Sequence, residues 1–226
     1  MDIGRELWIL KFLVAVVAAA WMFRQVRKPS GWLGRRVARA MNVTHATMTD
    51  WALEQLTVPK SAAILDVGCG GGETVRKLAA LAPEGKVVGL DYSAASVAVS
   101  RQTNAKEIET GRVRIEQGSV AALPFPDHTF DIVTAVETHY YWPDLPANAR
   151  EILRVLKPGG TFAMVAETYR GGPYRFLYAL VMPLLGAAFL SDAEHRGLLM
   201  QAGFTSVETT HRSGRNWICA TGRRPL

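Results

Sequence analysis

The sequence predicts an α/β fold: a doubly wound, seven-stranded and mostly parallel sheet with extra helices at the N-terminus. The first observation is that strand-type and helix-type segments alternate from residue 62 onward, as in a parallel sheet covered by helices on both faces. The second is a strand that runs into a glycine-rich turn, Ile64 to Gly72, and the third is Asp91, which ends the next strand. The turn and the carboxylate together predict a pocket for an adenosine-containing cofactor.

The elements follow one another in a regular order. A turn at Lys28–Gly31 separates residues 1–28 from a helical cap over 29–58, and the main domain covers 59–226. Helices in the cap are expected at 32–40 and 44–56. In the main domain we expect strands at 62–67, 86–91, 112–117, 130–136 and 160–166, and helices at 73–82, 94–109 and 145–156. The last elements expected are a helix at 192–202 and a hairpin of strands 204–211 and 216–223.

The N-terminal segment contains an apolar run from Leu7 to Phe23, broken by a single lysine, with Trp8 and Trp21 near its two ends. It is at the short end for a membrane span, which needs about 20 residues. Because basic residues follow the run, the positive-inside rule puts the rest of the chain in the cytoplasm. We therefore expect residues 1–28 to attach the chain to the cytoplasmic membrane through a single transmembrane helix. A helix lying in the interface or packed on the main domain is the alternative.

Charge and cysteine content limit the partners. The net charge is +6, and the excess lies in a cluster without acidic residues: Arg24, Arg27, Lys28, Arg35, Arg36 and Arg39. A nucleic-acid enzyme more often carries its basic residues around the substrate cleft. Here they lie beside an apolar segment, which predicts contact with anionic lipid and no nucleic-acid partner. The two cysteines form no disulfide framework and no metal-ligand spacing, so we expect a reducing compartment and no metal.

The glycine-rich turn differs from a dinucleotide site at one position. A nicotinamide fingerprint has a third glycine where this chain has Glu73, so a cofactor with an amino-acid tail fits better than a diphosphate. The turn resembles the first motif of the class I S-adenosylmethionine-dependent methyltransferases. The resemblance continues through residues 130–135 and 153–166 and covers roughly 43–224, closest to small-molecule enzymes of the quinone-biosynthesis type. It implies a Rossmann-like methyltransferase fold, S-adenosyl-L-methionine as cofactor and a small hydrophobic acceptor.

Within that resemblance, residues 169–190 lie where the family often covers its substrate. The run from Phe176 to Leu190 is strongly apolar and contains Pro183, which makes it too interrupted to predict a second span. An apolar lid implies an apolar substrate or a lid that enters the membrane. Ordinary packing against the N-terminal helices explains the run equally well.

The cofactor pocket is expected at the carboxyl ends of the strands. Asp66 would accept backbone N–H groups of the turn, Asp91 would accept both ribose hydroxyls, and Tyr92 would lie along the adenine. Ser119 stands where the family often has an acidic residue, which weakens the expected adenine contact. The full set of predicted cofactor residues is Asp66, Gly68, Cys69, Gly70, Asp91, Tyr92, Ser93, Gly118, Ser119, Val120, Val136 and Glu137.

Three residues are candidates for the chemistry. Methyl transfer needs alignment, and it needs a base only if the acceptor must lose a proton. We expect His139 to be that base because its unperturbed pKa lies near neutrality, and Tyr140 or Tyr141 to orient an oxygen. His45 is expected to reach over the cofactor from the other side. Glu137 would hold the amino group of the cofactor or a backbone turn, or it would act on the substrate.

Other function classes remain open on the sequence. A protein that binds the cofactor without catalysis would keep Asp66, the glycines and Asp91. A nicotinamide-dependent oxidoreductase is disfavoured by Glu73. A nucleic-acid methyltransferase is disfavoured because no Asn-Pro-Pro-Tyr-type tetrad follows residues 130–136.

Overall fold

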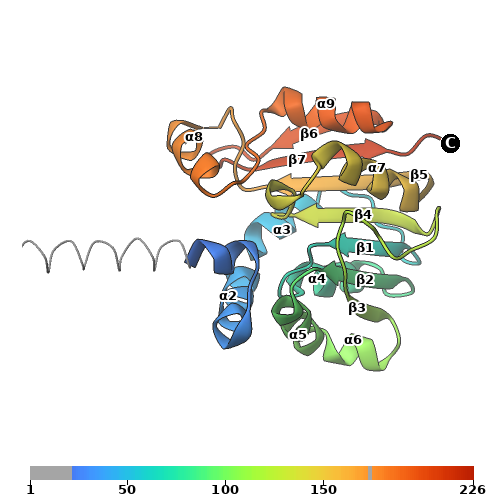
Figure 1. Cartoon of the computed structure of the whole chain (residues 1–226). Helices are drawn as coiled ribbons and strands as arrows, with labels where there is room; N and C mark the ends of the chain where they lie inside the picture. The colour runs from blue at the N-terminus through green and yellow to red at the C-terminus, as the bar shows by residue number, and fades with distance from the viewer. Residues whose placement is uncertain (1–21, 173–174) are drawn as a thin grey trace, which may run out of the picture.

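The computed structural model describes residues 22–172 and 175–226, and in this part of the chain seven strands form one sheet in the order β3-β2-β1-β4-β5-β7-β6 (Figure 1). Strands β1 to β5 are parallel, and β7 and β6 close one edge as an antiparallel pair. Their bounds are β1 (Ala63–Val67), β2 (Lys86–Asp91), β3 (Val113–Gln117), β4 (Phe130–Val136), β5 (Leu156–Ala166), β6 (Thr205–His211) and β7 (Ile218–Arg223). The predicted fold class is confirmed.

The helices occupy both faces of the sheet and one end of it (Figure 1). They are α2 (Gly31–Thr44), α3 (Ala46–Leu53), α4 (Glu73–Leu81), α5 (Ala94–Thr103), α6 (Ala105–Glu109), the 3₁₀ turn η1 (His139–Tyr141), α7 (Leu145–Val155), α8 (Arg175–Leu184) and α9 (Asp192–Ala202). Residues 22–27 are also helical. The single helix predicted at 94–109 is two helices, because the chain breaks at Asn104, whose side chain donates to the carbonyls of Gly72 and Ser100.

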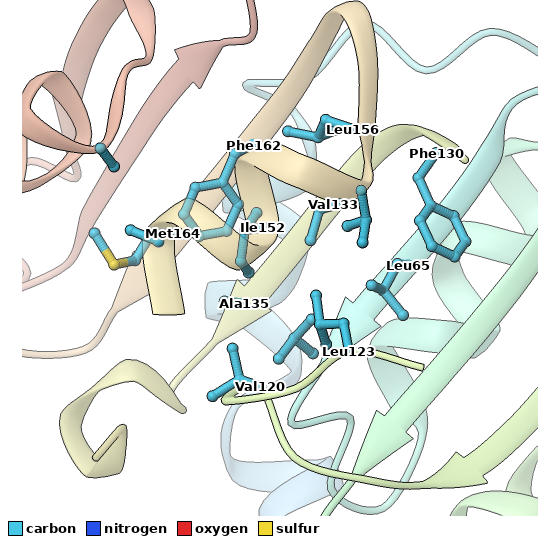
Figure 2. Close-up of a cluster of buried hydrophobic side chains, with 14 of the residues drawn as sticks. Leu65, Val120, Leu123, Phe130, Val133, Ala135, Ile152, Leu156, Phe162 and Met164 are labelled. Carbon is cyan, nitrogen blue, oxygen red and sulfur yellow. The ribbon is translucent and has the colours of Figure 1, made fainter. Parts of the chain in front are cut away.

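The sheet is buried on both faces, as a parallel sheet should be. On one face, side chains of β1, β4 and β5 pack against Ile152 of α7, with Leu65, Val133 and Phe162 fully buried (Figure 2). On the opposite face, Ile64 packs in a second cluster with residues of α4 and α5. Because both faces of the sheet are covered, the positions of the strand ends are fixed, and a ligand can bind there.

The N-terminal helices lie across the carboxyl ends of the strands. Met48 and Trp51 of α3 pack against Val165 of β5, and the Asn42 side chain of α2 donates to the Gly71 carbonyl over 2.9 Å. Within the described ranges no helix combines the length and the apolar character that a membrane crossing requires. The run from Leu7 to Phe23 lies, apart from its last two residues, outside the described residues.

Candidate active site

A cavity of about 510 Å³ lies at the carboxyl ends of the parallel strands, next to the reversal of strand order at β1. Its volume falls in the range of small-ligand pockets, roughly 300–1,000 Å³. The predicted site residues that line it are His45, Gly68, Cys69, Gly70, Asp91, Tyr92, Gly118, Ser119, Val120, Val136, Glu137 and Tyr140. Asp66, Ser93 and His139 are not among the described residues that line it.

The glycine-rich turn is held by the end of β2. The N–H groups of Gly68 and Cys69 both donate to the Leu90 carbonyl, over 2.7 and 3.0 Å. Gly68 has a φ of +74°, and a Cβ atom there would lie 2.1 Å from the Thr138 hydroxyl oxygen. Gly70 also has a positive φ, +52°, but has open space where a Cβ would be. The turn therefore packs tightly at Gly68 and leaves room beside Gly70.

Asp91 connects this turn to the cavity. Its Oδ2 accepts the Gly70 N–H over 2.9 Å and its Oδ1 accepts the Ser93 N–H over 2.8 Å. Burial raises the pKa of this carboxyl, and the two backbone hydrogen bonds oppose the shift. A carboxylate has about four acceptor sites, so each oxygen keeps one for a ligand hydroxyl.

Asp66 has a different role from the predicted one. Its side chain is 2% exposed, and Oδ1 accepts the Thr134 hydroxyl over 2.6 Å, which joins β1 to β4. Burial raises its pKa to about 7. The turn N–H groups that it was expected to accept are bonded instead to Leu90 and Asp91, so that prediction was wrong.

Tyr92 and Ser93 have different roles: Tyr92 lines the cavity, and Ser93 caps a helix. Tyr92 is partly exposed, lines the cavity, and donates its hydroxyl to the Arg27 carbonyl. Ser93 is buried and caps α5, accepting the Ser96 N–H, and it donates to the Pro29 carbonyl. The Ser93 hydroxyl is therefore bonded to backbone, and Ser93 is not among the described residues that line the cavity, where a cofactor contact was predicted.

The other predicted cofactor residues form the side walls. The Gly118 N–H donates to the Asp91 carbonyl over 3.0 Å, which places the end of β3 beside the end of β2. The Ser119 hydroxyl accepts the N–H of Ala121 over 3.2 Å. Burial raises the pKa of the Cys69 thiol well above its usual value, so Cys69 contributes packing rather than a thiolate.

Glu137 and Tyr140 form a hydrogen-bonded unit at the end of β4. The Tyr140 hydroxyl donates to Glu137 Oε1 over 3.0 Å and accepts the Thr168 N–H over 3.2 Å. Oε1 also accepts the Glu167 N–H. Burial raises the pKa of Glu137 to about 8, which favours the neutral form of this carboxyl near neutral pH. Of the three roles expected for Glu137, the structure contains the bond to a backbone turn.

His45 faces this unit from the junction of α2 and α3. Its Nε2 lies 3.7 Å from Oε2 of Glu167, a residue that follows β5. Burial lowers the pKa of His45, and the Glu167 carboxylate opposes the shift. Ligand-type atoms of His45, Glu137 and Glu167 all lie within 4.8 Å of one another. Three distant segments supply them, so no spacing in the sequence reveals the group.

His139 does not take the position predicted for it. Its side chain is fully buried, with its ring 4.5 Å from that of Tyr140 and 5.4 Å from that of His195. Neither ring nitrogen bonds to any residue in the described ranges. Burial lowers its pKa well below the usual value. His139 is not among the described residues that line the cavity, so its ring is not placed where the predicted base would meet an acceptor.

Tyr141, the alternative to Tyr140 for orienting an oxygen, also lines the cavity. Sequence reasoning missed several other residues that line it. They come from the N-terminal helices, the end of β5 and α8: Met41, Asn42, Thr49, Glu167, Thr168, Tyr178 and Met182. The apolar character of residues 176–190 could have indicated Tyr178 and Met182 of α8, because an apolar lid is expected to cover a bound ligand.

Comparisons with known proteins agree with this geometry. A family model described as a methyltransferase domain matches residues 65–164. A demethylmenaquinone methyltransferase from Geobacillus sp. (strain WCH70) is 32% identical over 164 residues, which cover 70% of each chain. The one from Bacillus licheniformis is also 32% identical and is covered to 69%.

Solved structures support the fold. The Haloferax volcanii protein crystallised with the Trm112 methyltransferase activator superposes with a TM-score of 0.73 at 22% identity, over 86% of this chain and 96% of that one. The YcgJ protein from Bacillus subtilis gives 0.65 at 20% identity, over 80% of this chain and all (100%) of that one. With the curated relatives, these findings identify the chain as a methyltransferase that belongs to the class I S-adenosylmethionine-dependent, small-molecule family.

Proposed function

We propose that this methyltransferase moves a methyl group from S-adenosylmethionine to a small, apolar acceptor of the quinone-precursor type. One observation carries the proposal: a single cavity is lined by both the Gly70–Asp91 pair and the His45–Glu167 pair. The curated relatives are named for demethylmenaquinone, which is an apolar ring compound of that type.

The cofactor side has the residues that the nucleoside needs. Asp91 would accept the two ribose hydroxyls with the acceptor sites left free by Gly70 and Ser93. Tyr92 would lie along the adenine, and the open backbone at Gly70 would approach the amino-acid tail. Glu73 also lines the cavity, and its negative charge disfavours a diphosphate in the same place.

The acceptor side has a group that can take a proton. When bound, S-adenosylmethionine supplies an electrophilic methyl group on a cationic sulfur. His45 would accept at Nε2 the proton that a hydroxyl or ring-carbon acceptor loses, and Glu167 would stabilise the imidazolium that forms. Tyr140 would act by holding Glu137 and the turn at Thr168, since its hydroxyl is already bonded to both.

The rest of the acceptor wall is largely apolar. Met41, Tyr141, Trp142, Tyr178 and Met182 line the cavity around the His45–Glu167 pair. The aromatic faces of these residues would also attract the cationic sulfur of the cofactor. An apolar, flat acceptor suits this wall better than a charged one.

The acceptor class fits attachment to the cytoplasmic membrane. We propose that residues 1–28 anchor the catalytic domain on the cytoplasmic side through a single helix, and that the basic cluster contacts anionic lipid. The apolar run and the following basic residues support this, and they are sequence observations.

The test is methyl transfer from labelled S-adenosylmethionine into a lipid extract of membranes. We expect a labelled, lipid-soluble product with the wild-type chain and none with Asp91→Ala. Retained binding of S-adenosylhomocysteine without any product would support the alternative, a protein that binds the cofactor and is catalytically silent.

A further inference from the structure

The helix α8 has two apolar faces. Phe176, Leu177, Leu180 and Leu184 are 78%, 61%, 69% and 80% exposed. At 100° per residue these four side chains fall within a quarter to a third of a turn of the helix, so they form one outer face. Tyr178 and Met182, on the opposite side, line the cavity. A helix that is apolar on the outside as well as the inside needs a second apolar surface to cover it.

The helical segment 22–27 extends this surface. Met22, Phe23 and Val26 are 46%, 47% and 39% exposed. The segment lies close to the end of α8, because a Cβ atom at Gly186 would be 3.8 Å from Nη1 of Arg27. Both helices lie at the end of the molecule where the parallel strands terminate (Figure 1). Val26 also lines the cavity, so the two segments form its outer wall.

The two segments that form this surface carry charge of one sign. Residues 22–49 and 168–190 contain no aspartate or glutamate. Arg24, Arg27, Lys28 and Arg175 are exposed beside the apolar side chains. Exposed apolar residues bordered by cations are the composition of a surface that binds anionic lipid headgroups and inserts into the acyl boundary. A protein partner for this surface would have to present negative charge beside an apolar surface.

We propose that the four outer residues of α8, together with Met22, Phe23 and Val26, form a lipid-docking face that rests on an anionic bilayer. The acceptor then enters the cavity directly from the lipid, between α8 and segment 22–27. This route rests on the proposed function, in which the acceptor is apolar. It extends the membrane contact proposed for residues 1–28, which include Met22, Phe23 and Val26, to the outer face of α8.

The experiment uses the full-length chain with a fluorescent label on a single introduced cysteine. Both native cysteines are buried, so an introduced thiol takes the label. Leu180→Cys reports on the docking face, and Met200→Cys, 54% exposed on α9, is the matched control. Vesicles contain an acyl-chain nitroxide quencher and either phosphatidylcholine alone or phosphatidylcholine with phosphatidylglycerol. We expect quenching at position 180 to exceed that at 200 by about threefold or more, and most strongly with the anionic lipid.

Equal quenching at the two positions, or none at 180, overturns the proposal. A change at 180 that follows protein concentration without vesicles also overturns it, because a second copy would then cover the face. Binding of S-adenosylhomocysteine to each labelled variant shows that it is folded. Since quenching requires no turnover, a failure of the proposed function, seen as absent methyl transfer, is distinguishable from a failure of docking.

Discussion

The N–H of Gly70 donates to Oδ2 of Asp91 over 2.9 Å, and this bond joins the glycine-rich turn after β1 to the end of β2. The carboxylate therefore does two things at once. It fixes the open side of the turn, and it presents its remaining acceptor sites to the cavity. The two halves of the expected cofactor pocket depend on each other through this contact.

Removing that carboxylate should weaken cofactor binding. Asp91→Ala is expected to raise the Kd for S-adenosylhomocysteine more than tenfold, at least about 1.4 kcal/mol, because ribose contacts and the hold on Gly70 are lost together. Isothermal titration calorimetry measures it. Asp127→Ala, at an exposed carboxylate paired with Arg154, is the control and should bind normally. An unchanged Kd in Asp91→Ala would remove Asp91 from the cofactor site.

His45 should matter for turnover and not for cofactor affinity. Loss of a general base lowers rates by roughly 10²- to 10⁴-fold, so we expect His45→Ala to reduce kcat by at least about a hundredfold with an unchanged Kd for S-adenosylhomocysteine. Steady-state kinetics and calorimetry separate the two quantities. His128→Ala, at an exposed histidine, is the matched control. A wild-type kcat in His45→Ala would exclude the base.

The same assignment predicts a pH profile. A base must be neutral, so kcat should rise as pH increases through the pKa of His45, which burial places below 6.5, and level off above it. The Glu167 carboxylate raises this pKa. Glu167→Gln should therefore shift the acidic limb to lower pH, which a pH–rate profile of the two proteins measures. A shift to higher pH would contradict the pairing.

Asp66 should link stability to pH. Its pKa is about 7 in the folded chain against 3.8 for the unperturbed group, so the folded state holds this proton more tightly. The unfolding free energy should then fall as pH rises from about 4 to 7. Asp66→Asn, which does not ionise, should flatten this dependence in urea unfolding between those values. An equally steep dependence in the variant would show that Asp66 is already ionised near its unperturbed pKa.

The apolar run near the N-terminus should determine whether the protein is found in the membrane fraction or in the supernatant. Deleting residues 1–21 leaves Val26 and Arg27, which line the cavity, in place. We expect the shortened chain to move from the membrane fraction toward the supernatant and to keep its affinity for S-adenosylhomocysteine. An unchanged fractionation would show that this run is not the main anchor.

The sheet could be predicted from local sequence patterns, because each strand is a short apolar segment bounded by recognisable turn residues. Gly68, Gly70 and Asp91 were predictable for the same reason, since strand-end position fixes them. The roles of Asp66 and Ser93 were not, because competing backbone donors and acceptors decide them in three dimensions. His139 illustrates the same limit: a histidine after β4 reads as accessible, yet η1 turns its ring into the core beside His195. Glu167 gave no signal, because its relation to His45 exists only after β5 and the α2–α3 junction meet.

Thr138 fills the space beside Gly68 where a Cβ atom would lie. The glycine-rich turn, on the proposed nucleoside side of the cavity, is therefore in close contact with the segment that leads into η1. A ligand that shifts one of these backbones by even a methyl group's width must push on the other. Binding of cofactor and acceptor should then be energetically coupled, each changing the affinity for the other by the same factor.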